Sequence, residues 1–301
     1  FKHVYPFFKP YMKQIPLMFY SDNPAIATGL ARITKDLALI ASNLPQFRVG
    51  SYGRSGHYST QLPFAQYSFS DKGEHGDWGE MMLPGVWQDF AGSEQGILFC
   101  IQDVSRLNWL VDPRGINGEL GRFLRNKPFK TWLYCPVDGY GVGGKMTSQC
   151  ASSLQKFDRL LAYSLFGKGV LETTLGKEVD WAPHGFNGNV FVPRGKTAGR
   201  AILASTYGLQ ILDTDVLVGC VMTNQVRKDW GTAFGTIARL KDKIPNLKFW
   251  AHVDVVTRHW NLMALAQDFG LMETVVFTQN GQFSSEQLSY VYSACDCTML
   301  P

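Results

Sequence analysis

The chain has 301 residues, of which 45% are hydrophobic and 18% are charged, and its formal net charge is +4. Such a composition excludes an intrinsically disordered protein, and the length allows two domains that each bury a core. The mild positive charge comes without a basic run, so it argues against a nucleic-acid-binding protein and allows only a weak attraction to anionic surfaces or substrates.

Apolar runs and amphipathic stretches alternate along the first half of the chain. Residues 15–20 predict a strand, residues 28–41 a helix with one apolar stripe, and residues 47–50 a short second strand. The stretch 51–87 is rich in Gly, Ser and aromatic residues, which predicts long loops with at most one strand, at 65–69. Further strands are expected at 96–102, 131–135, 158–162 and 179–182, and further helices at 148–157 and 165–175.

The same alternation returns in the second half of the chain. It follows a connection at 185–214 that is rich in Gly, Pro and Asn and is expected to hold a helix at 200–207. Strand 216–221, an amphipathic helix and strand 247–253 then form one β/α unit. A helix at 258–269, a strand at 275–278, a helix from Ser284 with a capping box to Gln287, and a strand at 297–300 complete the set.

Two β/α sets separated by a linker predict an α/β fold with two Rossmann-like domains, whose parallel sheets face each other across a cleft. We expect an N-terminal domain at residues 1–195, a linker at 196–214 and a C-terminal domain at 215–301.

The six cysteines lie mostly in apolar, strand-like runs, and no two of them form a C-x-x-C pair. This pattern predicts reduced core thiols in a cytoplasmic protein rather than a disulfide framework or a zinc site. No apolar run is long enough to span a bilayer, and the N-terminal residues show no continuous signal-peptide core.

The strongest candidate site is the pair Arg227 and Lys228, which follows the strand 216–221 and precedes a helix that Asp229 is expected to cap. In parallel α/β sheets, ligands collect beyond the carboxyl ends of strands, where helix N-termini attract anions. Two cations at that place would stabilise the charge on a departing diphosphate. A solvated surface pair accounts for the same two residues equally well.

Three other positions follow expected strands. Thr28 and Gly29 open the first helix, where a glycine lets a ligand approach the backbone amides, although an ordinary capped helix start looks the same. Asp138 follows the strand at 131–135 and can bind an acceptor hydroxyl or cap the next helix. His184 lies in a Pro-His-Gly turn, where it can contact a sugar or phosphate or bond only to the backbone.

The segment 139–145, GYGVGGK, matches most of the phosphate-binding pattern G-x-x-x-x-G-K and follows a strand. Met146 stands where that pattern needs the Ser or Thr that binds magnesium, so a flexible loop beside the binding site is favoured over a P-loop nucleotidase. The segment 78–87, WGEMMLPGVW, can stack on a sugar ring, although tryptophans more often anchor loops and cores.

Four segments, in this order, resemble passages of the retaining glycosyltransferases of family 4. They are SDNPAIATGLARITKDLA, FDRLLAYSLFGKGVLETTLGKEVDWAPHGFNGNVFVP, VGCVMTNQVRKDWGTAFGTIARL and VVFTQNGQFSSEQLSYVYSACDCTMLP. The likeness spans nearly the whole chain. It implies a GT-B fold and transfer of a sugar from a nucleotide-activated donor to an acceptor hydroxyl, which is a glycan, a lipid or another alcohol. It further implies that the N-terminal domain, residues 1–195, binds the acceptor and that residues 215–301 form a partial C-terminal domain that binds the nucleotide sugar.

The resemblance also implies roles for individual residues. Lys228 would hold the donor diphosphate. Thr223 stands where the family often has an arginine, so either Arg227 or Asn224 would take over that contact. The nucleobase would lie against the backbone of the three consecutive residues Gly281, Gln282 and Phe283. The leaving phosphate would accept the proton of the acceptor, so no metal or other cofactor is expected.

One departure concerns the acidic E-x7-E region of the family, which follows the strand that ends here at Leu300 and Pro301. We therefore expect a chain that is truncated before this motif and has weak or no transferase activity. A non-catalytic module that binds a nucleotide or sugar is the first alternative, and a nucleotidase that uses residues 139–145 is the second. The expected location is the cytoplasm, with a weak peripheral association with the inner face of the membrane.

Overall fold

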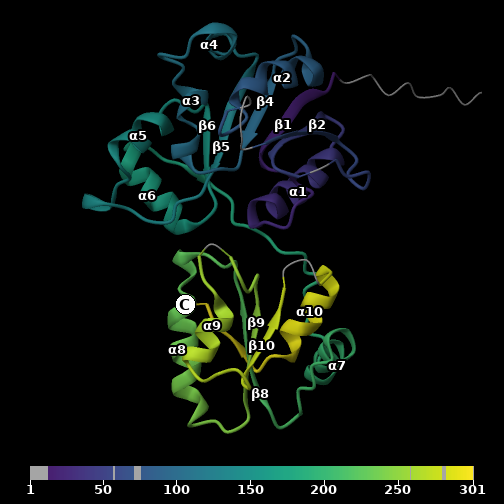
Figure 1. Cartoon of the computed structure of the whole chain (residues 1–301). Coiled ribbons are helices and arrows are strands. Elements are labelled where there is room, and N and C mark those ends of the chain that lie inside the picture. Colours follow the sequence, from purple (N-terminus) through teal and green to yellow (C-terminus); the bar gives the residue numbers. More distant parts are fainter. Residues whose placement is uncertain (1–12, 57, 71–75, 258, 280–282, 301) are drawn as a thin grey trace, which may run out of the picture. The chain divides into compact units, whose positions relative to one another are not determined.

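The computed structural model describes residues 13–56, 58–70, 76–257, 259–279 and 283–300. The chain divides into two compact units, one through His184 and one from Gly185 (Figure 1). We call them unit 1 and unit 2.

The division between the units differs from the expected domain ends at 195 and 214. The expected linker holds a helix, α7 (Lys196–Tyr207), which packs against α10 (Ser285–Ala294) inside unit 2. The residues before α7 belong to the same unit, because the Arg194 amide donates to Ser293 Oγ (3.0 Å) and Ser289 Oγ donates to the Val192 carbonyl (3.2 Å).

Unit 1 is a parallel sheet of seven strands, in the order β3-β2-β1-β4-β5-β6-β7. Its strands are β1 (Ile15–Asp22), β2 (Phe47–Arg54), β3 (Ala65–Phe69), β4 (Gly96–Cys100), β5 (Phe129–Cys135), β6 (Arg159–Ala162) and β7 (Asp180–Trp181). Its helices are α1 (Gly29–Ser42), α2 (Leu83–Ala91), α3 (Asn108–Val111), α4 (Gly118–Arg125), α5 (Ser148–Leu154) and α6 (Leu165–Leu175).

The central strand β1 is buried on both faces. Met18 and Tyr20 enter one core of unit 1, and the alternating residues Leu17 and Phe19 enter the other. Helices cover both faces of a parallel sheet, so a central strand reads as a continuous apolar run, and this run made β1 predictable.

The prediction of loops over 51–87 is wrong in part. Strand β2 continues to Arg54, and α2 begins at Leu83. The glycines of β2 hid the strand, because they contribute no apolar side chain to the pattern. Their small size is required: a Cβ at Gly53 would lie 2.4 Å from the Asn23 Cα, in the loop after β1. The strand predicted at 65–69 is present as β3.

Unit 2 is a parallel sheet of four strands, in the order β10-β9-β8-β11. They are β8 (Val216–Val221), β9 (Leu247–His252), β10 (Val275–Thr278) and β11 (Cys297–Thr298), and α8 (Trp230–Lys241) and α9 (Leu262–Asp268) join α7 and α10 around them. One core gathers around Trp230 and Phe234, and another gathers around Trp250 and Leu203.

Each sheet reverses its strand order at one place. In unit 1 the switch lies beside β1, which pairs with β2 on one side and β4 on the other. In unit 2 it lies beside β8, which pairs with β9 and β11. The predicted α/β fold with two Rossmann-like units is confirmed, and the loops after β1 and β8 are the expected ligand sites. Within the described ranges, no helix is long and apolar enough to cross a membrane.

Candidate functional site

The loop after β8 ends in a tight turn that leads into the N-terminus of α8. A 3-10 turn (Val226–Lys228) leads to Asp229, whose φ of 44° lies in the left-handed region. Asp229 caps α8 as predicted, since Oδ1 accepts from the Thr232 amide (3.2 Å) and Oδ2 accepts from the Thr232 hydroxyl (2.7 Å). The first amides of α8, on Trp230 and Gly231, have no partner inside the helix and face outward.

The two cations of this turn have no counter-charge in the described part of the chain. Arg227 is exposed and Lys228 is half-buried, and neither forms an ion pair with a described carboxylate. The Lys228 ammonium lies close enough to β8 to lower the pKa of the Cys220 thiol, although burial has the larger effect and raises that pKa to about 12. Two unneutralised cations beside a helix N-terminus are chemically suited to a di- or polyanion.

Trp230 fixes this loop to the core of unit 2. Its side chain is fully buried, and its indole Nε1 donates to the Thr223 carbonyl (3.2 Å). The helix start and the preceding loop therefore form one rigid piece.

Asn224 joins the loop after β8 to the loop after β9. It is buried, and its amide nitrogen donates to the carbonyls of Asp254 (2.9 Å) and Trp260 (2.9 Å). The proposed phosphate contact by Asn224 would have to break these bonds. In the structure Asn224 positions the backbone around the anion site.

We expect Asn224→Ala to destabilise unit 2 by about 1–3 kcal/mol, because a buried side chain that donates to the carbonyls of Asp254 and Trp260 is lost. Chemical denaturation of the full chain measures this loss. Asn246→Ala is the matched control: its amide also donates to a carbonyl, that of Thr214, but in an exposed position. The control should change the free energy of unfolding by no more than about 0.5 kcal/mol. Equal effects of the two variants would contradict the structural role of Asn224.

The next two strands of the sheet, β9 and β10, end level with β8 and carry a second group of residues. Val221 pairs with His252, which pairs with Thr278, so the last residues of β8, β9 and β10 are neighbours. The Phe283 ring lies 5.3 Å from the His252 ring between centroids. Gly281 and Gln282, the other expected contacts of the nucleobase, lie outside the described residues.

In unit 1, the start of α1 is open to a ligand. Thr28 is the predicted cap: its hydroxyl accepts from the Ala31 amide (3.1 Å) and donates to the buried carboxylate of Asp22 (2.7 Å). Gly29 is exposed, and nothing lies within 4 Å of the place where a Cβ would stand. A ligand can therefore approach the first amides of α1 beside the switch point.

A cluster beside Thr28 was not predicted. Asp22, the last residue of β1, lies 3.4 Å from the Nε of Arg54, the last residue of β2. The guanidinium carbons of Arg54 and Arg106 lie 5.4 Å and 4.6 Å from the centroid of the Trp78 ring. The available sequence signal was Asp22, a polar residue at the end of the apolar strand β1, whereas Arg54 lies beyond the predicted strand 47–50. Of the segment 78–87, Trp78 belongs to this cluster, whereas Trp87 is fully buried in the core.

Asp138 and His184 lie at the carboxyl ends of other strands of unit 1. Asp138 follows β5 and is exposed. The His184 ring packs against Tyr163 (4.4 Å between centroids) and Tyr134 (5.2 Å). Burial lowers the pKa of His184, so its imidazole is neutral at pH 7. A neutral histidine in an aromatic setting suits contact with a hydroxyl better than with a phosphate.

The predicted residues thus form two groups. Arg227, Lys228, Asn224 and Phe283 belong to the carboxyl edge of the sheet in unit 2, and Thr28, Gly29, Asp138 and His184 belong to that of unit 1. Across the described ranges, no group of His, Cys, Asp and Glu side chains is arranged to hold a metal ion.

The loop 139–145 is not built like a phosphate-binding loop. A 3-10 turn occupies Val142–Gly144, and α5 begins only at Ser148, capped by Thr147. Lys145 therefore precedes the helix instead of standing in its first turn.

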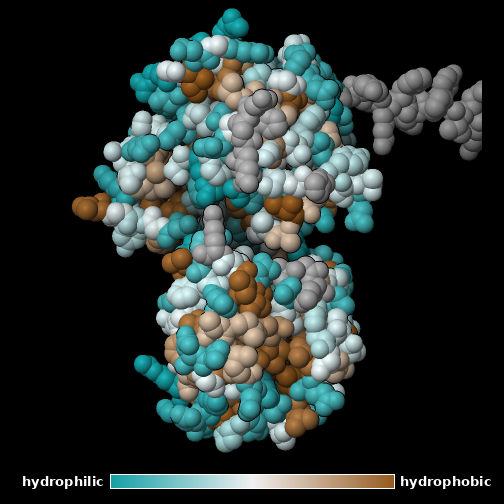
Figure 2. Space-filling view, in the orientation of Figure 1, coloured by the Kyte–Doolittle hydropathy of each residue, from teal (hydrophilic) through white to brown (hydrophobic). Residues whose placement is uncertain are grey.

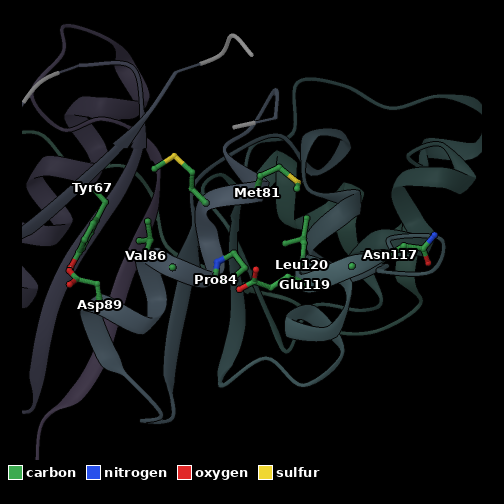
Figure 3. A pocket seen from close by; sticks show the side chains of 11 residues that line it. Tyr67, Met81, Pro84, Val86, Asp89, Asn117, Glu119 and Leu120 are labelled. Carbon is green, nitrogen blue, oxygen red and sulfur yellow. The ribbon is translucent and has the colours of Figure 1, made fainter. Parts of the chain in front are cut away.

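Two further surface features lie on the flanks of the units. A groove of about 550 Å³ lies between α2 and the start of α4 in unit 1, with Met81, Val86 and Leu120 among its apolar residues (Figure 3). At one end the Tyr67 hydroxyl donates to Asp89 (2.6 Å). On unit 2, hydrophobic residues gather between α9 and α10 (Figure 2). Neither feature adjoins the switch points.

No protein-family model matches the sequence, and no curated protein matches it. Solved structures do match. HepE from Anabaena, in complex with UDP and glucose, is 14% identical with a TM-score of 0.64 over 95% of this chain and 73% of that chain. A glycosyltransferase from Rickettsia africae is 11% identical with a TM-score of 0.64 over 96% and 73%.

A third solved structure is WaaG, described as a glycosyltransferase involved in lipopolysaccharide biosynthesis. It is 14% identical with a TM-score of 0.59 over 95% of this chain and 75% of that chain. Similarity at this level of identity concerns the fold. The chain has the GT-B fold, built from two Rossmann-like units with parallel sheets.

Proposed function

We propose that this protein is a glycosyltransferase that moves a sugar from a nucleotide-activated donor to an acceptor hydroxyl with retention. The observation that carries the proposal is the pair Arg227 and Lys228, unneutralised at the start of α8 and next to the switch point of its sheet. The fold agrees, since it is shared with HepE solved with UDP and glucose and with starch synthase IV solved with ADP and acarbose.

In the proposed reaction, the bond between the anomeric carbon and the diphosphate oxygen breaks while the acceptor oxygen bonds to the same carbon on the same face. Lys228, Arg227 and the first amides of α8 stabilise the charge that grows on the diphosphate. A phosphate oxygen takes the acceptor proton, so the chain supplies no general base, and the cations take the place of a metal ion.

Further binding residues are proposed within unit 1. The open amides of α1 at Gly29 suit a phosphate or sugar group, with Thr28 held in place by Asp22. Asp138 accepts a hydrogen bond from an acceptor hydroxyl, and the neutral imidazole of His184 bonds to a sugar hydroxyl. All six cysteines are free, which suits the reducing cytoplasm. The net charge of +4 favours a weak association of the protein with an anionic membrane surface.

A nucleoside diphosphate should stabilise the folded protein, because it binds only the native anion site. At a concentration of 100 Kd the expected gain is about 2.7 kcal/mol. Thermal unfolding of the full chain with UDP, GDP and ADP measures this gain, and release of UDP or GDP from the matching nucleotide sugar tests turnover. Unchanged unfolding with all three nucleotides would refute the proposed function. Thermal stabilisation by a nucleotide without release of UDP or GDP from the nucleotide sugar would show that the protein binds nucleotides but does not catalyse the transfer.

A further inference from the structure

A buried histidine ends the strand next to the one that leads to Lys228. His252 is the last residue of β9 and is 6% exposed, and Thr278, the last residue of β10, is 2% exposed. Trp250 lies on the same face of β9 as His252, since side chains alternate along a strand, and it is fully buried. The side chains of Trp250 and His252 both hydrogen-bond to the hydroxyl group of Thr278.

The Thr278 hydroxyl connects the two rings. Its oxygen lies 2.8 Å from the indole Nε1 of Trp250 and 2.8 Å from Nδ1 of His252. An indole nitrogen only donates, so the Thr278 oxygen accepts that bond and has its own proton left to donate. The hydroxyl is buried and has no other partner among the described residues, so it donates this proton to Nδ1 of His252.

This arrangement fixes the tautomer of His252. Burial lowers the pKa of His252, so the ring is neutral at pH 7 and carries one proton. Because Nδ1 accepts from Thr278, that proton lies on Nε2. Nε2 has no hydrogen-bond partner among the described residues, although the side chain is almost fully buried. The His252 side chain is buried as a whole, but Nε2 itself is not sealed from solvent, so this N–H group can donate to a ligand.

His252 ends the strand next to the one that leads to Lys228. Val221 of β8 and His252 are paired across neighbouring strands, which are about 4.8 Å apart. The loop with Lys228 follows Val221 directly. The Phe283 ring, 5.3 Å from the imidazole, adds an apolar wall on the side of β10. A planar base at this position would therefore contact the aromatic ring of Phe283 and the N–H donor of His252.

We propose that His252 recognises the nucleobase of the donor by donating from Nε2–H to a carbonyl oxygen of the base, with Thr278 as the positioning residue. This inference rests on the proposed function and adds a substrate class to it. Uracil and guanine carry a carbonyl oxygen where adenine carries an amino group, and an amino group would set a donor against a donor. UDP or GDP should bind more tightly than ADP.

The test measures the binding of UDP, GDP, ADP and inorganic diphosphate to the full chain by calorimetry. His252→Phe keeps an aromatic ring but removes the donor, so the Kd of the preferred nucleotide should rise about 10-fold while that of inorganic diphosphate stays unchanged. His252→Gln retains an N–H group and should lose less. His259→Phe changes an exposed imidazole of the same unit and should alter neither Kd.

Thr278 provides the second readout. Thr278→Val removes the hydroxyl at constant shape and should weaken nucleotide binding, and Thr278→Ser should restore it. Nitrogen NMR of the ring should show the Nε2–H tautomer in the free protein and a shift of that proton with UDP or GDP but not with diphosphate. Intact diphosphate binding also shows that each variant is folded.

The outcomes separate this inference from the proposed function. Nucleotide affinity that is unchanged in His252→Phe, with diphosphate still bound, would overturn the role of His252 and leave the function standing. Tighter binding of ADP than of UDP and GDP would overturn the proposed base class. Failure of the unaltered protein to bind any of the four ligands would overturn both proposals.

Discussion

Lys228→Ala is expected to raise the Kd for a nucleoside diphosphate roughly 10- to 100-fold. The ammonium group has no carboxylate partner among the described residues, so its full charge is available to the diphosphate, and a hydrogen bond to a charged group contributes about 1.5–3 kcal/mol. The loss should extend to inorganic diphosphate, because the contact is with the phosphates. Calorimetry on the full chain measures both constants, and turnover should fall at least as much.

Two further variants test whether the loss of affinity depends on a positive charge at position 228. Lys228→Arg keeps the charge and should retain most of the affinity for inorganic diphosphate. Lys243→Ala removes an exposed lysine just beyond the far end of α8 and should change the Kd little. The difference in Kd between Lys228→Ala and the unaltered protein should shrink at high salt, since dissolved ions screen a cation that is only half-buried. Equal losses in Lys228→Ala and Lys243→Ala would show that only net charge matters and that the site is elsewhere.

Arg200→Met is expected to destabilise unit 2 by about 3–5 kcal/mol. The Arg200 side chain is 4% exposed and donates to the carbonyls of Leu212 and Asp215 and to the carboxylate of Asp296 (3.3 Å). Its removal leaves the buried Asp215 carbonyl and the part-buried Leu212 carbonyl without a donor, and the Asp296 carboxylate without its innermost cation. Urea denaturation followed by the fluorescence of the unit 2 tryptophans should show the midpoint of that unit shifted downward.

Asp213→Asn is the matched control for Arg200. Asp213 also pairs with this guanidinium, but at 3.9 Å and with a side chain that is 81% exposed, so the effect should stay below about 1 kcal/mol. A small effect of Arg200→Met, similar to that of Asp213→Asn, would mean that buried water or Lys196 replaces the lost donors.

The alternation of apolar strands and amphipathic helices was sufficient to predict the fold class. Strand β8 and strand β10 have the predicted bounds, and Ser284 forms the predicted capping box with Gln287. These features depend on residues close together in the sequence. Burial on both faces of a parallel sheet also makes central strands such as β1 and β8 short, continuous apolar runs.

The parts that escaped prediction depend on distant contacts. The second half of β2 contains Gly53, whose place in a strand is explained only by its packing on Asn23. The helix α7 was expected within a linker, and its packing on α10, far along the chain, makes it part of unit 2. Local composition carries no information on such contacts.

The site shows the same contrast. The Asp229 cap and the position of Lys228 at a helix start follow from adjacent residues and were predicted. The partners of Asn224 lie 30 and 36 positions away, in another loop, so sequence alone suggested a ligand contact where the structure shows hydrogen bonds between two loops. The pair His252 and Thr278 was missed because each is one polar residue at the end of an apolar run, and only the strand register unites them.

The strand β11 determines the order in which the protein can fold during synthesis. Cys297 and Thr298 pair with Val218 and Gly219, so one side of β8 stays unpaired until the ribosome has made every other strand of unit 2. At about 5–20 residues per second this interval lasts several seconds, whereas unit 1 can already be native. An open edge of a hydrophobic strand invites pairing with other chains. Chaperone binding and aggregation of nascent chains should therefore concentrate on β8, and they should end when β11 has emerged.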